Sequence, residues 1–171
     1  MAFRNLGSRG AFAAAAIVCA LLLSYGFFLQ YYQGLEPCPL CLVQRAFFFG
    51  VLAVCLLAAL HAPGRAATVV YAILAALFAL GGGAIAARQV WLQHLPKDKV
   101  PQCGPDLYFM MENFPLSRTL KTLFSGTGEC ANVDWTFLGL SIAEWSLLWF
   151  AALFVYALWL AFRAPERARS W

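Results

Sequence analysis

Charged residues are scarce in this chain of 171 residues, where Asp, Glu, Lys and Arg together account for 12%. A typical soluble domain carries about 25%. The net charge of +4 is small, which gives no support to a nucleic-acid-binding protein. Hydrophobic residues make up 63% of the chain, and a small soluble domain cannot bury that share because much of its surface stays exposed. The composition therefore excludes a disordered chain and predicts a protein whose solvent is a lipid bilayer.

Cysteine is also infrequent. Six cysteines in 171 residues are too few for a small fold held together by disulfides. They are enough for a redox or metal site, so their positions along the chain have to decide between these possibilities.

Long stretches without any charged residue indicate four membrane-spanning helices. A helix needs about 20 apolar residues to cross the hydrocarbon core, and in lipid the backbone must satisfy its own hydrogen bonds. We therefore predict an all-α membrane protein, a four-transmembrane-helix bundle forming one membrane domain over residues 1–171. The predicted spans are residues 11–29, 42–60, 66–87 and 143–162, joined on one side by loops 30–41 and 88–142. We expect Gly81, Gly82 and Gly83 in the third span to be a helix-packing site.

The arginines predict the orientation of the bundle. One side holds six basic residues and a single acid, Glu166, whereas the other side holds six basic and seven acidic residues. Because cytoplasmic segments carry an excess of Lys and Arg, we expect both termini in the cytoplasm and both loops outside it. No cleavage motif follows the first span, which ends Leu29-Gln30-Tyr31-Tyr32-Gln33, so we expect that span to be retained.

The six cysteines divide into two groups. Cys19 and Cys55 lie inside predicted spans, where a thiol behaves as a small, unreactive hydrophobe. The other four lie in the predicted extracytoplasmic loops: Cys38, Cys41, Cys103 and Cys130. Disulfides persist on that side of the membrane, so these four are the candidate redox residues.

The pair Cys38-Pro39-Leu40-Cys41 has the spacing of a readily opened disulfide. Cys41 comes at the start of the second span, where the positive end of a helix dipole would stabilise a thiolate. Arg45 follows one helical turn later. It could stabilise the thiolate and bind the carbonyl oxygen of a ligand, or it could simply reach the membrane surface. The next three residues, Phe47 to Phe49, could flank a flat aromatic ligand or face lipid.

The second loop carries the other two cysteines. Cys103 lies between prolines and a glycine, which predicts an exposed segment that another protein can reach. A Cys103–Cys130 bridge would close a loop of 28 residues and could be a structural staple. Four thiolates could alternatively bind zinc, although we expect no metal. Residues 115–124 have the pattern of a short basic amphipathic helix lying on the membrane.

Taken together, these features resemble the bacterial DsbB family of inner-membrane thiol:quinone oxidoreductases. Four spans, a Cys-x-x-Cys followed by Gln44-Arg45, and two cysteines in a long second loop all fit that family. The stretch Asp134-Trp135-Thr136-Phe137-Leu138-Gly139-Leu140-Ser141 also matches it.

The resemblance implies a specific electron path. A reduced periplasmic oxidase of the DsbA type would attack a Cys103–Cys130 disulfide and form a mixed disulfide at Cys103. Electrons would pass to Cys38–Cys41 through a transient Cys38–Cys130 bond, since thiolates are the attacking species. Cys41 would then reduce ubiquinone, or menaquinone, held near Arg45. The quinone carries the electron chemistry, and the protein supplies placement and charge.

Three other interpretations remain open at this point. The first is a vitamin K epoxide reductase-like enzyme, although in such enzymes the quinone-proximal Cys-x-x-Cys follows the other pair, whereas here it comes first. The second is a non-catalytic membrane subunit with a structural disulfide or zinc site. A reductase that carries electrons outward would need reactive cysteines within its spans, where only Cys19 and Cys55 are found. The role of His94 is left undecided.

Overall fold

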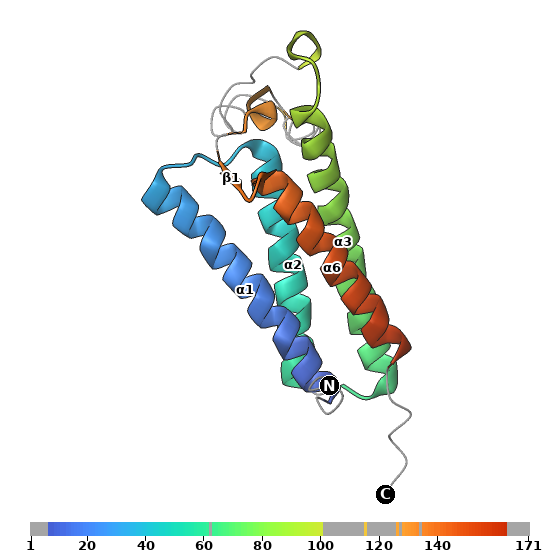
Figure 1. Cartoon of the computed structure of the whole chain (residues 1–171). Helices are drawn as coiled ribbons and strands as arrows, with labels where there is room; N and C mark the ends of the chain where they lie inside the picture. The colour runs from blue at the N-terminus through green and yellow to red at the C-terminus, as the bar shows by residue number, and fades with distance from the viewer. Residues whose placement is uncertain are drawn as a thin grey trace, which may run out of the picture.

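The computed structural model of the chain describes residues 7–61, 63–100, 115, 126, 128–133 and 135–163. Four long helices dominate these segments: α1 (Ser8–Gln33), α2 (Pro39–His61), α3 (Arg65–Gln93) and α6 (Ile142–Phe162). Each of the four is long and apolar enough to cross a membrane, which confirms the predicted fold class. Figure 1 shows the four helices packed side by side along their length, with α1 leaning away from the others at one end.

The helices extend beyond the predicted spans, most clearly in α3, which continues to Gln93 rather than ending at residue 87. A stretch free of charge marks the part of a helix that contacts hydrocarbon. The backbone hydrogen bonds of the helix run on past that part, so Arg88 and Gln89 still belong to α3. This extension places Gln89 beside the first turn of α2, as described below.

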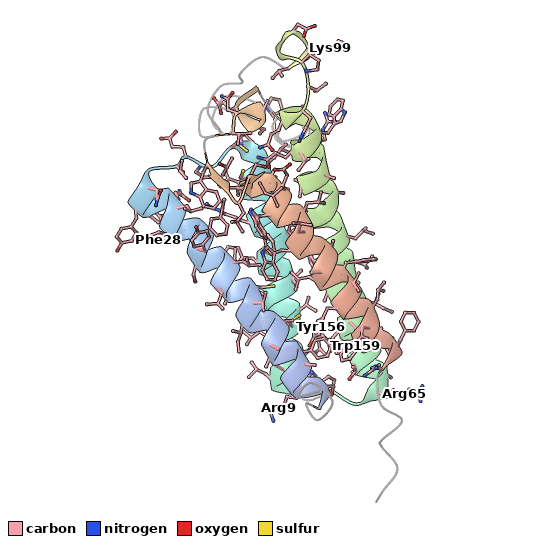
Figure 2. All side chains as sticks on the ribbon, viewed as in Figure 1. Arg9, Phe28, Arg65, Lys99, Tyr156 and Trp159 are labelled. Carbon is pink, nitrogen blue, oxygen red and sulfur yellow. The ribbon has the colours of Figure 1, made fainter. Side chains whose placement is uncertain are left out.

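One end of the bundle is fixed by bonds between helix ends. Nε of Arg9, near the start of α1, donates to the carbonyl oxygen of Ala59, near the end of α2, at 2.8 Å. The hydroxyl of Tyr156, on α6, donates to the carbonyl oxygen of Ala11 at 3.0 Å. Figure 2 shows Arg9 and Tyr156 toward this end and Lys99, which follows α3, at the opposite end. All of the described loop cysteines belong to the end that carries Lys99.

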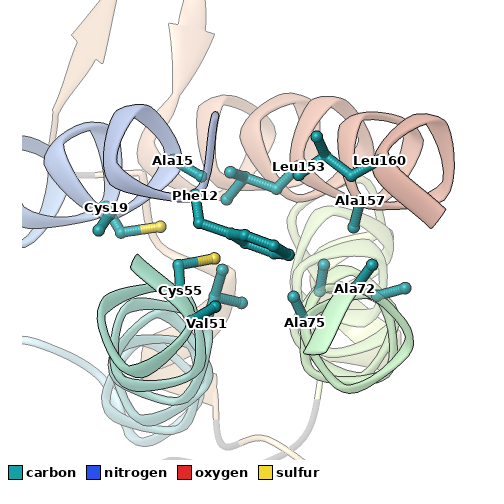
Figure 3. Packing of buried hydrophobic residues seen from close by; sticks show 14 of the residues in the cluster. Phe12, Ala15, Cys19, Val51, Cys55, Ala72, Ala75, Leu153, Ala157 and Leu160 are labelled. Carbon is teal, nitrogen blue, oxygen red and sulfur yellow. The ribbon is translucent and has the colours of Figure 1, made fainter. Parts of the chain in front are cut away.

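The interior of the bundle is made of small and aromatic side chains. Figure 3 shows Phe12 of α1 reaching between α2, α3 and α6, among alanines and leucines of those helices. Cys19 and Cys55 are buried in this cluster, as predicted for apolar thiols. They are not isolated from each other, however, because their side chains face one another between α1 and α2 (Figure 3).

The glycines of α3 form a packing site, as the sequence predicted, through Gly81 and Gly82 rather than Gly83. A Cβ atom at Gly81 would lie 2.5 Å from the Phe47 ring of α2, and one at Gly82 would overlap the Phe150 ring of α6. Phe150 is fully buried and stacks on Phe48, with ring centroids 3.9 Å apart. The missing side chains therefore let aromatic rings from both neighbours lie directly on the α3 backbone.

The described parts of the second loop lie on the helix ends. They comprise the short helices η2 (Lys97–Lys99) and η3 (Gly128–Ala131), and the strands β1 (Thr136–Phe137) and β2 (Leu140–Ser141). The two strands pair antiparallel and lead into α6. Ser141 caps α6: its hydroxyl accepts from the Glu144 amide at 3.3 Å and donates to Oε1 of Gln93 at 2.8 Å. The amphipathic helix predicted over residues 115–124 lies outside the described residues, apart from Pro115.

The glycine contacts predict opposite effects for two adjacent substitutions. Gly82→Ala should destabilise the protein by about 1–2 kcal/mol, because overpacking against Phe150 outweighs the better helix propensity of alanine. Gly83→Ala is the matched control. Its Cβ would lie 3.5 Å from Phe150, an ordinary contact, so it should be neutral or stabilising by up to about 1 kcal/mol. Equilibrium unfolding in detergent measures both, and equal stabilities of the two variants would contradict this account of the packing.

Candidate redox site

The start of α2 presents the Cys-x-x-Cys pair. Cys38 directly precedes the helix, and Pro39 is its first residue, a position where the missing N–H costs nothing. The amide of Leu42 donates to the carbonyl oxygen of Cys38 at 3.2 Å and closes the first turn. Cys41 lies in that turn, at the positive end of the α2 dipole, as the sequence predicted. The two sulfurs are 3.1 Å apart as free thiols, with Cys38 donating to Cys41.

A third cysteine from the second loop joins this pair. Cys130 lies in η3, fully buried, and packs with Leu40 of α2 and Leu92 of α3. Gly126 makes this packing possible, because its φ of 78° is a left-handed conformation and a Cβ there would lie 2.6 Å from Leu92. A hydrogen bond with the Cys130 thiol raises the pKa of the Cys38 thiol above its usual range, and the Cys41 thiol and burial act in the same direction. Cys38 is therefore a protonated thiol lying between two others.

Two buried amides complete the surroundings of the sulfurs. Gln89 of α3 donates from Nε2 to Cys41 at 3.3 Å and to Cys38 at 3.4 Å. Its Oε1 accepts from Nε2 of Gln44, on α2, at 2.6 Å. Both glutamines are almost fully buried, and buried polar groups are costly unless they are hydrogen-bonded. Here each amide has a partner, and Gln89 is held with its nitrogen toward the thiols.

The bond between the two sulfurs distinguishes the cysteines. The Gln89 amide donates to both sulfurs, and the Cys38 thiol donates to Cys41 in addition. An acceptor for a proton on Cys41 is Oε1 of Gln89, at the longer distance of 3.6 Å. Charge-assisted hydrogen bonds are stronger than neutral ones, so this arrangement suits negative charge on Cys41 rather than on Cys38.

Arg45 has a second role that the sequence did not indicate. Its guanidinium donates to Oε1 of Gln30 and, at 3.0 Å, to the carbonyl oxygen of Gly26, both on α1. It also lies 5.0 Å from the centre of the Phe27 ring. It acts on the Cys41 sulfur through its charge. Arg45 thus connects α1 to α2 beside the cysteine pair. The interpretation that it merely reaches the membrane surface does not describe these contacts.

The three phenylalanines after Arg45 separate in the structure. Phe48 is buried against Phe150, and Phe47 packs on Gly81 and edge-on to Phe78. Phe48 therefore belongs to the core, and Phe47 is partly buried against it. Phe49 is 46% exposed, with its ring 6.3 Å from that of Phe27, so it alone of the three is available beside Arg45.

The structure brings together Cys38, Cys41, Cys130 and Arg45 among the predicted site residues, whereas Cys103 lies outside the described residues. His94 is exposed, and its Nδ1 lies 2.8 Å from the Val90 carbonyl oxygen of its own helix. Gln89 was missed. The available signal was an uncharged polar residue just past the charge-free stretch of α3, which sequence alone does not place near the thiols. Within the described segments, no group of three or more His, Cys, Asp or Glu side chains, the three neighbouring thiols included, is arranged to hold a metal ion.

Comparison with known proteins identifies the family. The sequence model described as "Disulfide bond formation protein DsbB" matches residues 8–160. A relative named Disulfide bond formation protein B from Azoarcus sp. (strain BH72) is 51% identical over 154 residues, covering 90% of this chain and 92% of the relative. Proteins of the same name from Methylococcus capsulatus and Hahella chejuensis are 48% and 50% identical, covering 88% and 85% of this chain and 92% and 88% of their own lengths.

These matches confirm the resemblance predicted from the sequence. They cover all four long helices and the loop cysteines between them, and they imply an oxidoreductase role in disulfide bond formation for a multi-pass membrane protein. With a cluster of three thiols at the end of a four-helix membrane bundle, the chain belongs to the disulfide bond formation protein B family.

Proposed function

We propose that this protein oxidises a reduced DsbA-type dithiol oxidase in the periplasm and passes the electrons through two cysteine pairs to membrane quinone. The observation that carries the proposal is the position of Cys38, whose thiol interacts with both Cys41 and Cys130. A thiol between two others can exchange one disulfide partner for the other with little movement. This is the property that a relay between two loops requires.

The proposed steps balance as two thiol–disulfide exchanges followed by quinone reduction. A thiolate of the partner attacks a Cys103–Cys130 disulfide at Cys103, and the second partner thiol releases the oxidised partner. The Cys130 thiolate attacks Cys38 of the Cys38–Cys41 disulfide, so a Cys38–Cys130 bond forms and the electron pair stays on Cys41. Cys103 then attacks Cys130 of the Cys38–Cys130 bond, which restores the first disulfide and releases the Cys38 thiolate. Cys38 and Cys41 form their disulfide again, and the two electrons and two protons given up in that step would convert quinone to quinol.

Ubiquinone, or menaquinone, fits the surroundings of Cys41. An arginine has five N–H donors, and two of them are used by Gln30 and Gly26, so Arg45 has others for a quinone carbonyl oxygen. The ring of Phe27 lies against the guanidinium, and exposed Phe49 is next to it. When bound, quinone supplies the two-electron chemistry. Arg45 would hold its oxygen and favour negative charge on Cys41.

The order of the cysteines and the family relationship disfavour the vitamin K epoxide reductase-like alternative. The contact of Cys38 with both Cys41 and Cys130 favours exchange between the pairs over a mere structural staple. For the protein's location we propose the bacterial inner membrane with both termini cytoplasmic. This orientation would place the thiol cluster on the oxidising side, where disulfides persist.

Partner oxidation tests the proposal directly. Purified protein incubated with a reduced DsbA-type oxidase and ubiquinone should oxidise the partner and form quinol in equal amounts. Cys103→Ser should abolish partner oxidation but leave quinone-dependent oxidation of small dithiols largely intact, because small thiols can reach Cys38–Cys41 directly. Incubated with the oxidised partner, Cys130→Ser should instead hold it in a mixed disulfide at Cys103, because the free Cys103 thiol opens the partner's disulfide and no Cys130 thiol is present to displace it. Absence of quinone-dependent partner oxidation in the parent protein would overturn the proposed function.

Substitutions at Arg45 separate its charge from its planar set of donors. Loss of a charge-assisted hydrogen bond worth about 1.5–3 kcal/mol should weaken apparent quinone affinity roughly tenfold to a hundredfold in Arg45→Ala. Arg45→Lys should have an intermediate quinone affinity, because it keeps the charge and loses the planar set of donors. Quinone titration of dithiol oxidation measures both.

Gln30→Ala is the matched control for Arg45, since it removes a bond to α1 and leaves the guanidinium in place. It should change quinone affinity by no more than a few fold. If Gln30→Ala weakens quinone use as much as Arg45→Ala, then Arg45 acts by holding α1 rather than by binding quinone.

The orientation has its own test. A reporter enzyme that is active only in the cytoplasm should be active when fused after Trp171, and a periplasmic reporter at the same site should be inactive, because the arginine-rich ends remain inside. The periplasmic reporter fused after Lys99 gives the converse control. Periplasmic activity at Trp171 would contradict the proposed topology.

A further inference from the structure

We propose that Gln89 is a positioning residue for the redox pair: its amide nitrogen holds the sulfurs of Cys38 and Cys41 together and supports Cys41 as the leaving group when Cys38 changes partner. This inference rests on the proposed function, and it adds a residue on α3 to a site otherwise built from α2 and the second loop. None of the steps above requires Gln89.

In the structure the Gln89 amide points its nitrogen toward the thiols. Its Oε1 is occupied by the Gln44 amide at 2.6 Å, so Nε2 faces the thiols at 3.3 Å from Cys41 and 3.4 Å from Cys38. With only 4% of its surface exposed, the side chain is largely shielded from water that could replace these bonds. A rotation that broke them would leave buried polar groups unpaired.

The same geometry matters when the disulfide opens. As Cys130 attacks Cys38, the bond between Cys38 and Cys41 breaks and its electron pair remains on the Cys41 sulfur. Exchange is faster when the leaving thiolate is stabilised, and an N–H donor stabilises an anion more than a neutral sulfur. The described titratable groups that act on Cys41 are Cys38 before α2, Cys130 from η3 and Arg45 on α2 itself. From α3, Gln89 acts as an uncharged donor.

Alkylation of the reduced pair tests the assignment without partner or quinone. In a Cys103→Ser, Cys130→Ser background, the rate of Cys41 alkylation is followed against pH by peptide mass spectrometry. Gln89→Leu should move the midpoint of this profile upward by about one to two pH units, the loss expected for one hydrogen bond to a charged group. Gln89→Glu should move it at least as far, because it replaces the donor with a negative charge.

Gln93→Leu is the matched control. It lies one turn farther along α3, and its Oε1 bonds Ser141 instead of a thiol, so it should leave the midpoint unchanged. A general loosening of α3 would affect this variant as well. Gln44→Leu frees the Gln89 amide to turn. It should therefore shift the midpoint when Gln89 is present, and it should cause no further shift when combined with Gln89→Leu.

The outcomes separate this inference from the proposed function. An unchanged midpoint in Gln89→Glu and Gln44→Leu overturns the role of Gln89, even if Gln89→Leu fails to fold. An equal shift in Gln93→Leu overturns it too. Failure of partner oxidation with a shifted midpoint overturns the proposed function and leaves the assignment of Gln89 standing.

Discussion

The site depends on the close approach of α2 and α3, because this contact brings the first turn of one helix against a buried amide of the other. Gly81 allows the Phe47 ring to lie on the α3 backbone, and Gly50 of α2 similarly receives the Phe78 ring of α3. Farther along the same pair of helices, Gln44 meets Gln89 at 2.6 Å. In an apolar environment an unpaired amide is costly, so the hydrogen bond fixes the register that the aromatic rings permit. Both sulfurs of the pair are then placed by the same contact.

Much of the fold could be predicted from the sequence, because the bilayer imposes a simple rule on it. Charge-free stretches identified the four helices, and two of the three adjacent glycines form the packing site that was expected. The ends of the helices were harder to predict. A helix that leaves the hydrocarbon can continue through polar residues, as α3 does through Arg88 and Gln89, and composition marks the end of the apolar segment rather than the end of the hydrogen-bonded backbone.

The candidate site was predictable where its residues are close in sequence. Cys38, Cys41 and Arg45 fall within two helical turns, and their residue types alone suggested redox chemistry. What the spacing could not show is where long side chains point. Arg45 reaches across to α1 and Gln89 reaches from α3 to α2, and both contacts depend on how helices far apart in sequence are packed. Phe47 and Phe48 illustrate the converse, because a run of aromatic residues beside a reactive cysteine suggested a ligand although two of the three pack in or against the core.

The polarity of the thiol cluster gives the site a direction. Cys38 is held protonated between Cys130 and Cys41, with its pKa raised chiefly by the bond to Cys130. Donors from Cys38 and Gln89 converge on Cys41, and Arg45 places a positive charge nearby. Negative charge is therefore best accommodated on the sulfur that is farther along α2 and nearer to Arg45. Opening of the Cys38–Cys41 disulfide would thus leave its electron pair beside Arg45, on the side away from the second loop. In this arrangement the position of the charge, rather than any movement of the helices, would direct electrons from the loop into the membrane.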